Sequence, residues 1–555
     1  MNWLRLGTGE CRSLSSKASS FGARTELMIL RWCSATPGSH AASSVFCAPR
    51  LLLTGRGSRF SVKTSIGGES VSTEQSAPQA SLEEKPRNKA VFKWVLMIAL
   101  VTFFAGLLFG YDQGVISGAL KGIGNSFNVG DGAKQIITSW VTLGALIAAL
   151  VAGMSADRFG RRPVLLAAGL LFIAGAVIQA VTPGVEILVL GRLITGFGIG
   201  FASVIAPLYA AEMAPQRIRG RIVSTYQLAI TFGIFIAYLV SDLLDSAEWR
   251  TMFLLAAVPG VILIICVMIV PESSRWYVKM GRKDKARESL SKVTEPAEVE
   301  KELSEVEAQV NAEAADGEAT WAEVFSPRVR KALIVGVGLA IFQQITGINA
   351  IIYYASTIFE SAGLVSTKSQ TVATLYCVGL TNVLATFIAV AYIDRFGRRP
   401  LLLMGFIGMF VSLCAVAIGF GTQSTADTGA GPSIVGIITM VGLVVFIASF
   451  AFSLGPVVWT IISEIYPGRV RGKAVSFATA ANWGAAFLVA EFFLTLTSGI
   501  GESATFFLFA AMCILGFIFT WRYVPETRGR SLEEIQEMWN KGGSIKSWDE
   551  TAPKP

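Results

Sequence analysis

One carboxylate in the sequence points to proton chemistry. Asp112 lies in Phe109-Gly110-Tyr111-Asp112-Gln113-Gly114, inside the first long apolar stretch of the chain. A charged side chain in the middle of a membrane-spanning helix costs about 2.5–3.5 kcal/mol on insertion scales, so a cation, water or a proton must offset the charge. Burial disfavours the charged carboxylate and a nearby cation favours it, so such a group can load and release a proton. The alternative is a structural ion pair that fastens two helices.

Other charged residues gather in loops that occur twice. Asp157-Arg158-Phe159-Gly160-Arg161-Arg162-Pro163 returns as Asp394-Arg395-Phe396-Gly397-Arg398-Arg399-Pro400, with seven identities at an offset of 237. At a constant offset of 252, Glu464, Pro467, Arg471 and Gly472 repeat Glu212, Pro215, Arg219 and Gly220. Pro525-Glu526-Thr527 likewise corresponds to Pro271-Glu272-Ser273. The motifs keep the same order both times, which indicates a duplicated unit of the kind that builds secondary transporters.

Composition places these motifs between membrane helices. The 555 residues are 52% hydrophobic and 15% charged, whereas soluble proteins carry roughly 25% charged residues. From Val91 onward the chain consists of apolar stretches of about 20 residues, the length that crosses a bilayer as a helix. We therefore expect an all-α membrane protein with twelve transmembrane helices in two pseudo-symmetric six-helix halves. The expected spans are 92–118, 134–155, 163–183, 186–209, 222–243, 250–271, 332–360, 370–392, 400–420, 433–463, 474–498 and 503–524.

The net charge of +8 lies mostly at the N-terminal end. Residues 1–70 hold nine Lys/Arg and three acids (+6), and the other 485 residues hold 38 basic and 36 acidic residues (+2). The body therefore offers no basic surface for nucleic acid. Its four cysteines are scattered singly and the one histidine, His40, lies in the tail, so we expect no zinc site, disulfide framework or other cofactor.

Two interpretations of the N-terminal tail stay open. Residues 1–70 are rich in Ser and Arg and poor in acids, which is typical of an organelle transit peptide. Trp3, Trp32 and three cysteines are unusual in such a peptide, and a translation start near Val71 is the alternative.

Basic loops set the expected orientation. The Arg-rich loops lie on one side together with both termini and the central segment, so this side is expected to be cytoplasmic. The central run from Lys283 to Ala315 is expected to form short polar helices with no apolar core. The expected regions are an N-terminal tail (1–90), a first half (91–271), a linker (272–331), a second half (332–524) and a C-terminal tail (525–555).

Together the motifs resemble those of the sugar porter family in the major facilitator superfamily. The resemblance rests on the paired Arg-rich loops, Gly191-Arg192, Pro271-Glu272-Ser273-Ser274-Arg275, Phe342-Gln343-Gln344 with Asn349, Gly455-Pro456 with Trp459, and Pro525-Glu526-Thr527. It covers about residues 92–538 and is strongest toward bacterial proton-coupled symporters for xylose, galactose or myo-inositol. It implies a transporter that performs no covalent chemistry. It also implies that Asp112 couples transport to protons with Arg192 as its partner, because facilitative glucose carriers typically have Asn here.

The resemblance further implies a sugar pocket. Hydroxyl groups that leave water need replacement hydrogen bonds on otherwise apolar helices. The matching positions are Gln227, Gln343, Gln344, Asn349, Tyr353, Asn382, Trp459, Asn482 and Trp483. Asn349 follows Gln343 by six residues, about 600° of helix rotation, so the two share no face of a straight helix, and we expect a break at Gly347. For each residue the alternative is an interhelical hydrogen bond or an interfacial anchor.

The repeated charged motifs are expected to form a gating network on the cytoplasmic side. The resemblance implies salt bridges that hold the outward-open state and break as the inner gate opens, while the alternative is that positive loops only set topology. The residues are Asp157, Arg161, Arg162, Glu212, Arg219, Glu272, Arg275, Asp394, Arg398, Arg399, Glu464, Arg471 and Glu526. Glu491 matches no family position; its nine-residue distance from Asn482 puts it on the opposite helix face, where it is expected to meet a neighbouring helix.

The leading hypothesis is therefore a monomeric monosaccharide:proton or polyol:proton symporter in the plasma membrane. A facilitative carrier is the nearer alternative, and a non-transporting sugar sensor on the same fold is the alternative of another class. A plastid envelope is the alternative location if residues 1–70 are a transit peptide.

Overall fold

The computed structural model describes residues 53–54, 61–66, 69–73, 89–215, 218–244, 248–315, 320–422, 434–467, 469–528 and 534. The chain divides into two units, Met1–Lys85 and Pro86–Pro555. In the first unit, β1 (Leu53–Thr54), β2 (Ser61–Ile66) and β3 (Glu69–Thr73) form an antiparallel sheet in that order. Most of residues 1–70 lie outside the described residues, so the transit peptide and the start near Val71 stay predictions.

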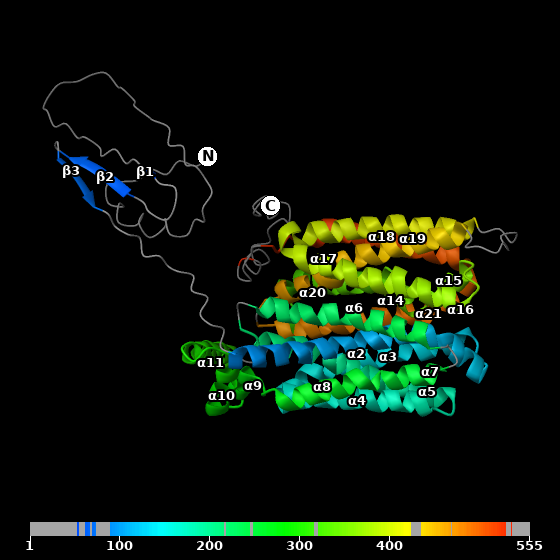
Figure 1. The fold of residues 1–555 in the computed structure, drawn as a ribbon, viewed down its shortest axis with the longest axis horizontal. Helices are drawn as coiled ribbons and strands as arrows, with labels where there is room; N and C mark the ends of the chain where they lie inside the picture. Colours follow the sequence, from blue (N-terminus) through cyan, green and yellow to red (C-terminus); the bar gives the residue numbers. More distant parts are fainter. Residues whose placement is uncertain are drawn as a thin grey trace, which may run out of the picture. The chain divides into compact units, whose positions relative to one another are not determined.

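The first half of the second unit consists of helices α2 to α8, which form six spans (Figure 1). The first five are α2 (Lys89–Phe127), α3 (Asp131–Phe159), α4 (Arg161–Val181), α5 (Val185–Met213) and α6 (Arg219–Leu243). The sixth consists of α7 (Trp249–Leu255) and α8 (Ala257–Ile269). The first span was expected to end near residue 118. The helix α2 instead continues to Phe127, beyond the apolar stretch.

The second half contains broken spans. The seventh consists of α13 (Pro327–Ile345), α14 (Ile348–Tyr353) and α15 (Ala355–Ser361), and the eighth of α16 (Thr367–Ala373), the π-helix η3 (Thr374–Leu380) and α17 (Thr381–Phe396). The ninth is α18 (Arg398–Gly421), the tenth is α19 (Ile434–Phe452) with α20 (Leu454–Glu464), and α21 (Arg471–Tyr523) holds the last two. Eleven described helices have the length and hydropathy to cross a membrane. Since α21 is interrupted at Gly501 (φ +84°), the prediction of twelve spans is confirmed.

The linker between the halves has a small core of its own. It folds into α9 (Ser274–Lys279), α10 (Lys283–Val293), α11 (Val299–Ala315) and α12 (Trp321–Val324). The prediction that it lacks an apolar core is wrong, because Val278, Ala286, Leu290, Val299 and Leu303 pack together. Each short helix turns its few apolar residues inward and its many charges outward. The average hydropathy of the helix is therefore low although one of its faces is apolar.

Close helix contacts build each half. α2 packs on α6, α3 and α4 pack on α5, and α18 packs on α19 and α21. A Cβ atom added at Gly196 of α5 would lie 2.1 Å from the Val141 carbonyl oxygen of α3. Only glycine allows two backbones to come this near, which is how membrane helices gain packing energy.

The second unit has two distinct ends (Figure 1). Helices α9–α11 and the Arg-rich starts of α4 and α18 mark one of them, here named the basic end. The turn between α15 and α16 marks the other, here named the far end. The halves meet where α21 runs along α3 and where α6 packs on η3 and α17.

Candidate functional site

Asp112 and Arg192 form a buried ion pair inside the first half. Arg192 Nη1 lies 2.6 Å from Asp112 Oδ1, and the two side chains are 0% and 4% exposed. Arg192 Nε donates to the Ile137 carbonyl oxygen at 2.9 Å, so the pair joins α2, α5 and α3. Arg192 Nη2 is buried and has no hydrogen-bond partner within the described part of the chain. The partner implied for Asp112 is therefore in contact with it.

Four amide side chains expected to bind sugar form one hydrogen-bonded cluster in the second half. Asn482 Nδ2 donates to Gln343 Oε1 at 2.7 Å, and Gln344 Nε2 donates to Asn482 Oδ1 at 3.1 Å. Asn349 Nδ2 donates to Gln344 Oε1 at 2.8 Å. We name Gln343, Gln344, Asn349 and Asn482 the amide cluster. All four are buried, and together they offer both donors and acceptors.

A helix break makes this cluster possible. Gly347 separates α13 from α14 and has φ +94°, in the left-handed region that favours glycine. The break turns Asn349 back toward Gln344, which a straight helix would not allow. A Cβ atom at Gly347 would also lie 2.8 Å from the Phe509 ring. The expected break is thus present at the expected residue.

Gln113 connects the amide cluster to the first half, a role that the sequence does not predict. Its Nε2 donates to Asn349 Oδ1 at 3.0 Å and to the Tyr353 hydroxyl at 3.4 Å. Gln113 follows Asp112 directly, so the ion pair and the amide cluster are linked through neighbouring residues of α2. The signal that could have found it is a second polar residue beside Asp112 in an apolar stretch.

The remaining expected sugar residues belong to several helices and have separate contacts. Trp483 packs against Phe109 of α2 with ring centroids 5.0 Å apart. A Cβ atom added at Gly455 would lie 3.7 Å from Gln227 Nε2. The carbonyl of the preceding residue, Leu454, accepts a hydrogen bond from Gln343 Nε2. Trp459 is partly buried in α20 and Asn382 is buried in α17, and in the described structure no hydrogen bond joins either to the amide cluster.

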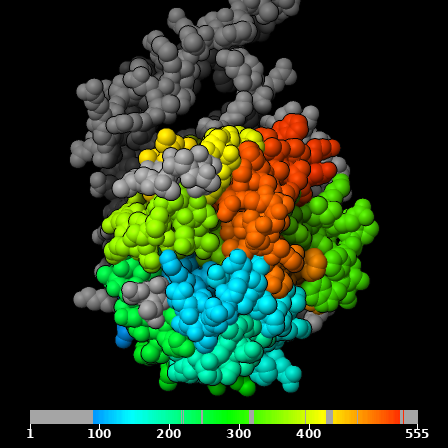
Figure 2. All heavy atoms as spheres, turned by 90° about the vertical axis from the view of Figure 1, so that its right-hand side faces the viewer, coloured from blue at the N-terminus to red at the C-terminus, as the bar shows by residue number. Residues whose placement is uncertain are grey.

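Polar contacts between the halves gather at the far end. Ser117 and Ser356 hydroxyls lie 3.1 Å apart, and Lys368 Nζ lies 2.8 Å from Asp242 Oδ1. On another side, Gln135 of α3 exchanges hydrogen bonds with Thr495 of α21. Seen from this end, segments of the first half in cyan meet those of the second half in lime and orange along a continuous surface (Figure 2). The far end is closed in this arrangement.

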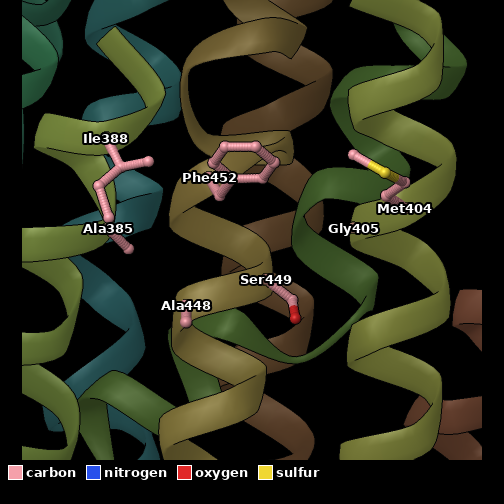
Figure 3. Close-up of a pocket in the computed structure, with 7 residues that line it drawn as sticks. All are labelled: Ala385, Ile388, Met404, Gly405, Ala448, Ser449 and Phe452. Atoms are coloured by element: carbon pink, nitrogen blue, oxygen red, sulfur yellow. The ribbon is translucent and has the colours of Figure 1, made fainter. Parts of the chain in front are cut away.

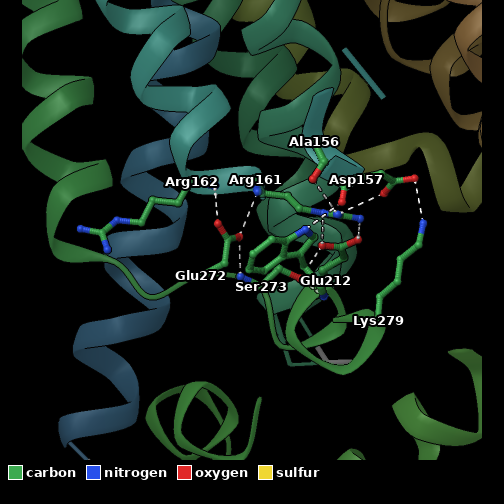
Figure 4. Close-up of polar contacts among 9 residues, drawn as sticks. Ala156, Asp157, Arg161, Arg162, Glu212, Glu272, Ser273 and Lys279 are labelled. Atoms are coloured by element: carbon green, nitrogen blue, oxygen red, sulfur yellow. Dashed lines mark hydrogen bonds and ion pairs between the residues drawn. The ribbon is translucent and has the colours of Figure 1, made fainter. Parts of the chain in front are cut away.

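Arg161 is the centre of a network at the basic end of the first half (Figure 4). Its Nη2 and Nε lie 2.7 and 2.9 Å from the two oxygens of Glu212. The two side chains are 5% and 6% exposed. Asp157 lies 3.2 Å from Arg161 Nη1 and 3.0 Å from Lys279 Nζ of the linker. The network therefore binds α3, α4, α5 and the linker helix α9 together.

Glu272 holds the start of α4 by its backbone. Its carboxylate accepts hydrogen bonds from the backbone N–H groups of Arg161, Arg162 and Ser273 at 3.0, 2.9 and 2.7 Å. A carboxylate at a helix N-terminus is favoured by the free N–H groups there. Burial raises the pKa of the Glu272 carboxyl, and the three backbone donors and the Arg161 guanidinium oppose the rise.

The second half repeats this arrangement with looser geometry. Glu526 accepts from the backbone N–H groups of Arg398 and Arg399 at 3.0 and 3.1 Å. Arg398 Nη2 lies 3.5 Å from Glu464 Oε1, and the Thr527 hydroxyl donates to Glu464 at 2.7 Å. The sequence repeat thus corresponds to a repeat of contacts.

Two other residues of the expected gating network have contacts of their own, and two have side chains that the structure does not describe. Arg275 donates to Gln309 of α11 at 3.4 Å, and Arg471 Nε donates to the Tyr466 carbonyl at 3.3 Å. Arg219 and Asp394 belong to α6 and α17, but their side chains lie outside the described residues.

A cavity of about 300 Å³ opens elsewhere, among α17, α18 and α19. Figure 3 shows its lining residues, which include Ala385, Met404, Ser449 and Phe452. Since none of the expected sugar residues lines it, the amide cluster remains the candidate site.

Three comparisons show which known proteins the chain is similar to. A family model described as sugar (and other) transporter matches residues 98–539. The galactose-proton symporter of Escherichia coli (strain K12) is 38% identical over 462 residues, which cover 83% of this chain and 97% of the symporter. The D-xylose transporter of Levilactobacillus brevis is 38% identical over 435 residues, 78% of this chain and 93% of the transporter. The solved structure of the xylose transporter XylE from E. coli, in a partially occluded inward open conformation, matches with a TM-score of 0.68 at 30% identity, covering 79% of this chain and 100% of that one.

Proposed function

The chain belongs to the sugar (and other) transporter family, and we propose that it moves a monosaccharide or polyol together with a proton across a membrane by alternating access. The observation that carries this proposal is the buried Asp112–Arg192 pair, which Gln113 joins to the amide cluster. The relatives named above include a galactose-proton symporter, which supports the same coupling in this chain.

In the proposed cycle, sugar hydroxyls replace the hydrogen bonds that the amide cluster makes with itself. Gln343, Gln344, Asn349 and Asn482 present donors and acceptors in one buried group. Replacement of these bonds by sugar bonds offsets the desolvation of the hydroxyls. Gln227, Tyr353, Asn382, Trp459 and Trp483 complete the proposed pocket.

Asp112 supplies the proposed coupling. When Asp112 takes up a proton, its carboxylate loses its negative charge, so the positive charge of Arg192 is left uncompensated and Arg192 must find another partner. Arg192 Nη2 has no hydrogen-bond partner among the described residues. This supports such an exchange, because a buried guanidinium nitrogen without a partner is costly. Since Gln113 directly follows Asp112, a change in the pair alters the contact with Asn349.

The proposed gates are the two ends of the seam between the halves. The basic end faces the cytoplasm, in keeping with the positive-inside rule, and the far end is closed here by contacts between the halves. The Arg161 network joins helices of the first half and the linker helix α9, and the Arg398 network joins elements of the second half. Each network keeps its helices together as a rigid body during rocking. The protein is an integral multi-pass membrane protein; we propose that it acts as a monomer in the plasma membrane.

The Asp112→Asn variant tests the coupling in vesicles with an imposed proton gradient. We expect uphill sugar uptake to fall by at least about tenfold while downhill sugar exchange persists, because Asn cannot carry the proton. Asp131→Asn is the control, since Asp131 is exposed at the start of α3. Undiminished uphill uptake in Asp112→Asn would identify a facilitative carrier, and absence of any flux in the unaltered protein would favour a sensor.

A further inference from the structure

The cavity of about 300 Å³ in the second half is a groove between α17 and α18, which both pack on α19 (Figure 3). Its lining is apolar except for the hydroxyl group of Ser449. Ile388 of α17 and Met404 of α18 stand at its rim and are about half exposed, so the groove opens to the surface that the bilayer surrounds. Its volume is at the lower end of the range of about 300–1,000 Å³ for small-molecule pockets. A flexible apolar chain therefore suits it.

The sequence repeat explains why a groove opens here. At the offset of 252 between the halves, Gly200 of α5 corresponds to Phe452 of α19, and at the offset of 237, Ala148 of α3 corresponds to Ala385 of α17. A Cβ atom added at Gly200 would lie 2.7 Å from the Ala148 Cβ atom, so α5 and α3 are in close contact. Phe452 and Ala385 both line the groove. A phenyl ring in place of glycine prevents α19 from approaching α17 in the same way, because only small residues allow helix backbones to come this near.

A stripe of side chains on α17 leads from the groove to the basic end. The stripe consists of Ala385, Ile388, Tyr392 and Arg395. Their spacing of three, four and three residues places them on one side of an α-helix, with Arg395 about 10 Å beyond Ile388 along the axis. Tyr392 and Arg395 are exposed. An exposed guanidinium thus stands at the mouth of an apolar groove.

Arg395 differs from the two arginines that follow it in the loop. Arg398 Nη2 lies 3.5 Å from Glu464 Oε1, and Arg399 Nη2 donates to the Trp521 carbonyl oxygen at 2.6 Å. Arg395 makes no ion pair with any residue that the structure describes. Its positive charge is therefore available to an anion from outside the protein.

We propose that the groove binds an anionic phospholipid of the leaflet at the basic end. One acyl chain lies in the groove between Ile388 and Met404, and the phosphate group bonds to Arg395. Guanidinium groups pair well with phosphate oxygens, and tyrosine, here Tyr392, favours the level of the lipid head groups. In the proposed orientation this leaflet is the cytoplasmic one, which carries anionic lipids that bind to basic pockets between spanning helices. The proposal goes beyond transport, since it requires only the membrane-spanning fold.

The bound chain would contact the segment that supports the amide cluster. Gly405 and Phe452 line the groove, and Ser453 follows at the break between α19 and α20. A Cβ atom at Gly405 would overlap the Ser453 hydroxyl group. The next residue, Leu454, accepts the hydrogen bond from Gln343 Nε2 at 2.8 Å. The groove and the amide cluster thus lie on either side of one helix break.

Photo-crosslinking with lipid probes tests the proposal. The purified full-length protein is placed in phosphatidylcholine vesicles that contain a small fraction of phosphatidylglycerol or phosphatidylcholine with a diazirine in the middle of one acyl chain. Crosslinked peptides from α17, α18 and α19 are quantified relative to those from α4, whose Leu170 is exposed. We expect the phosphatidylglycerol probe to label the groove about fivefold more than the phosphatidylcholine probe, which is the effect of one basic residue near an anionic lipid surface.

Two variants, each with a matched control, separate the head-group contact from the acyl-chain contact. Arg395→Gln is expected to lower labelling by phosphatidylglycerol to the level of phosphatidylcholine. Its control is Arg158→Gln, because Arg158 is exposed and holds the same place in the first loop motif. Ala448→Trp fills the groove and is expected to lower labelling by both probes at least about fivefold. Its control is Val441→Trp, which adds the same bulk at a position of α19 that is 59% exposed and does not line the groove.

The proposal is overturned if the two probes label the groove of the parent equally, or if Arg395→Gln is labelled like the parent. Equal losses in Arg395→Gln and Arg158→Gln would overturn it as well, since the preference would then belong to the whole basic end. Unchanged labelling of Ala448→Trp would show that the chain lies elsewhere. Arg395 is exposed, so its variant keeps the test decisive if Ala448→Trp does not fold. The measurement needs neither sugar nor a proton gradient, so its outcome is independent of the proposed transport.

Discussion

Three polar side chains of the spanning region have different contacts. Asp112 is buried against a guanidinium, whereas Glu491 is half-buried against a hydroxyl. Gln113 has a third kind of environment, since it bonds across the seam to Asn349 and Tyr353. Each polar side chain in the spanning region costs free energy unless it is satisfied, so these contacts decide which groups can exchange partners during transport.

Replacement of Gln113 by alanine is expected to weaken apparent sugar affinity by about fivefold to tenfold. The change removes the hydrogen bond that holds Asn349 from the first half, and one such bond contributes about 1 kcal/mol. The measurement is the KM for sugar exchange in vesicles.

Gln179→Ala is the matched control for this prediction. Gln179 is equally buried, but its hydrogen bonds go to Gly175 and Thr195 within the first half. An equal rise of KM in both variants would contradict a specific role for Gln113 in the pocket.

The interrupted helices of the second half bring the amide side chains together. The break between α13 and α14 brings Asn349 to Gln344, and a second break at Ser453 separates α19 from α20 next to the carbonyl of Leu454 that Gln343 contacts. The spacing of Gln343 and Asn349 predicts the first break, because helix rotation is fixed at about 100° per residue. The second break and the π-helix η3 could not be predicted, since packing of neighbouring helices decides them.

Gly347→Ala is expected to lower sugar affinity by about tenfold. Alanine at φ +94° is strained, at a cost on the order of 1–3 kcal/mol, and its Cβ would press on Phe509. Relief of that strain moves Asn349 away from the cluster. Binding of sugar to the purified protein measures the effect.

Gly501→Ala separates backbone strain from pocket geometry. Gly501 also has a positive φ of +84°, but a Cβ there would meet open space. We expect this variant to bind sugar normally. If both variants lose affinity alike, the cause is general destabilisation and the break at Gly347 has no special role.

The two halves of the molecule repeat the same Arg–Glu ion pair, which is shorter and more buried in the first half. In the first half, Arg161 and Glu212 approach to 2.7 Å with side chains 5% and 6% exposed. In the second half, Arg398 and Glu464 are 3.5 Å apart with side chains 13% and 27% exposed. Loss of one partner from a buried pair is more costly than loss from a partly hydrated pair.

Glu212→Ala is therefore expected to lower stability more than Glu464→Ala. The first change leaves a buried Arg161 with only its weaker contacts, at a cost of about 3–5 kcal/mol, and the second is expected to cost about 1 kcal/mol. Thermal unfolding of the detergent-purified proteins provides the measurement. Equal shifts of Tm in the two variants would show that the contrast in burial has no energetic consequence.

The sequence by itself determined the twelve spans and the duplication, and it predicted candidate polar residues for the site. Apolar length, helix periodicity and repeated motifs are local properties, so they can be read along the chain. Only the tertiary structure decided which polar groups meet, such as Gln113 with Asn349 and Glu491 with Ser139. It also decided that the apolar faces of the linker helices form a core of their own. Those pairings join residues up to 352 positions apart, and their geometry follows from how two six-helix halves pack along a seam, which local chemistry does not specify.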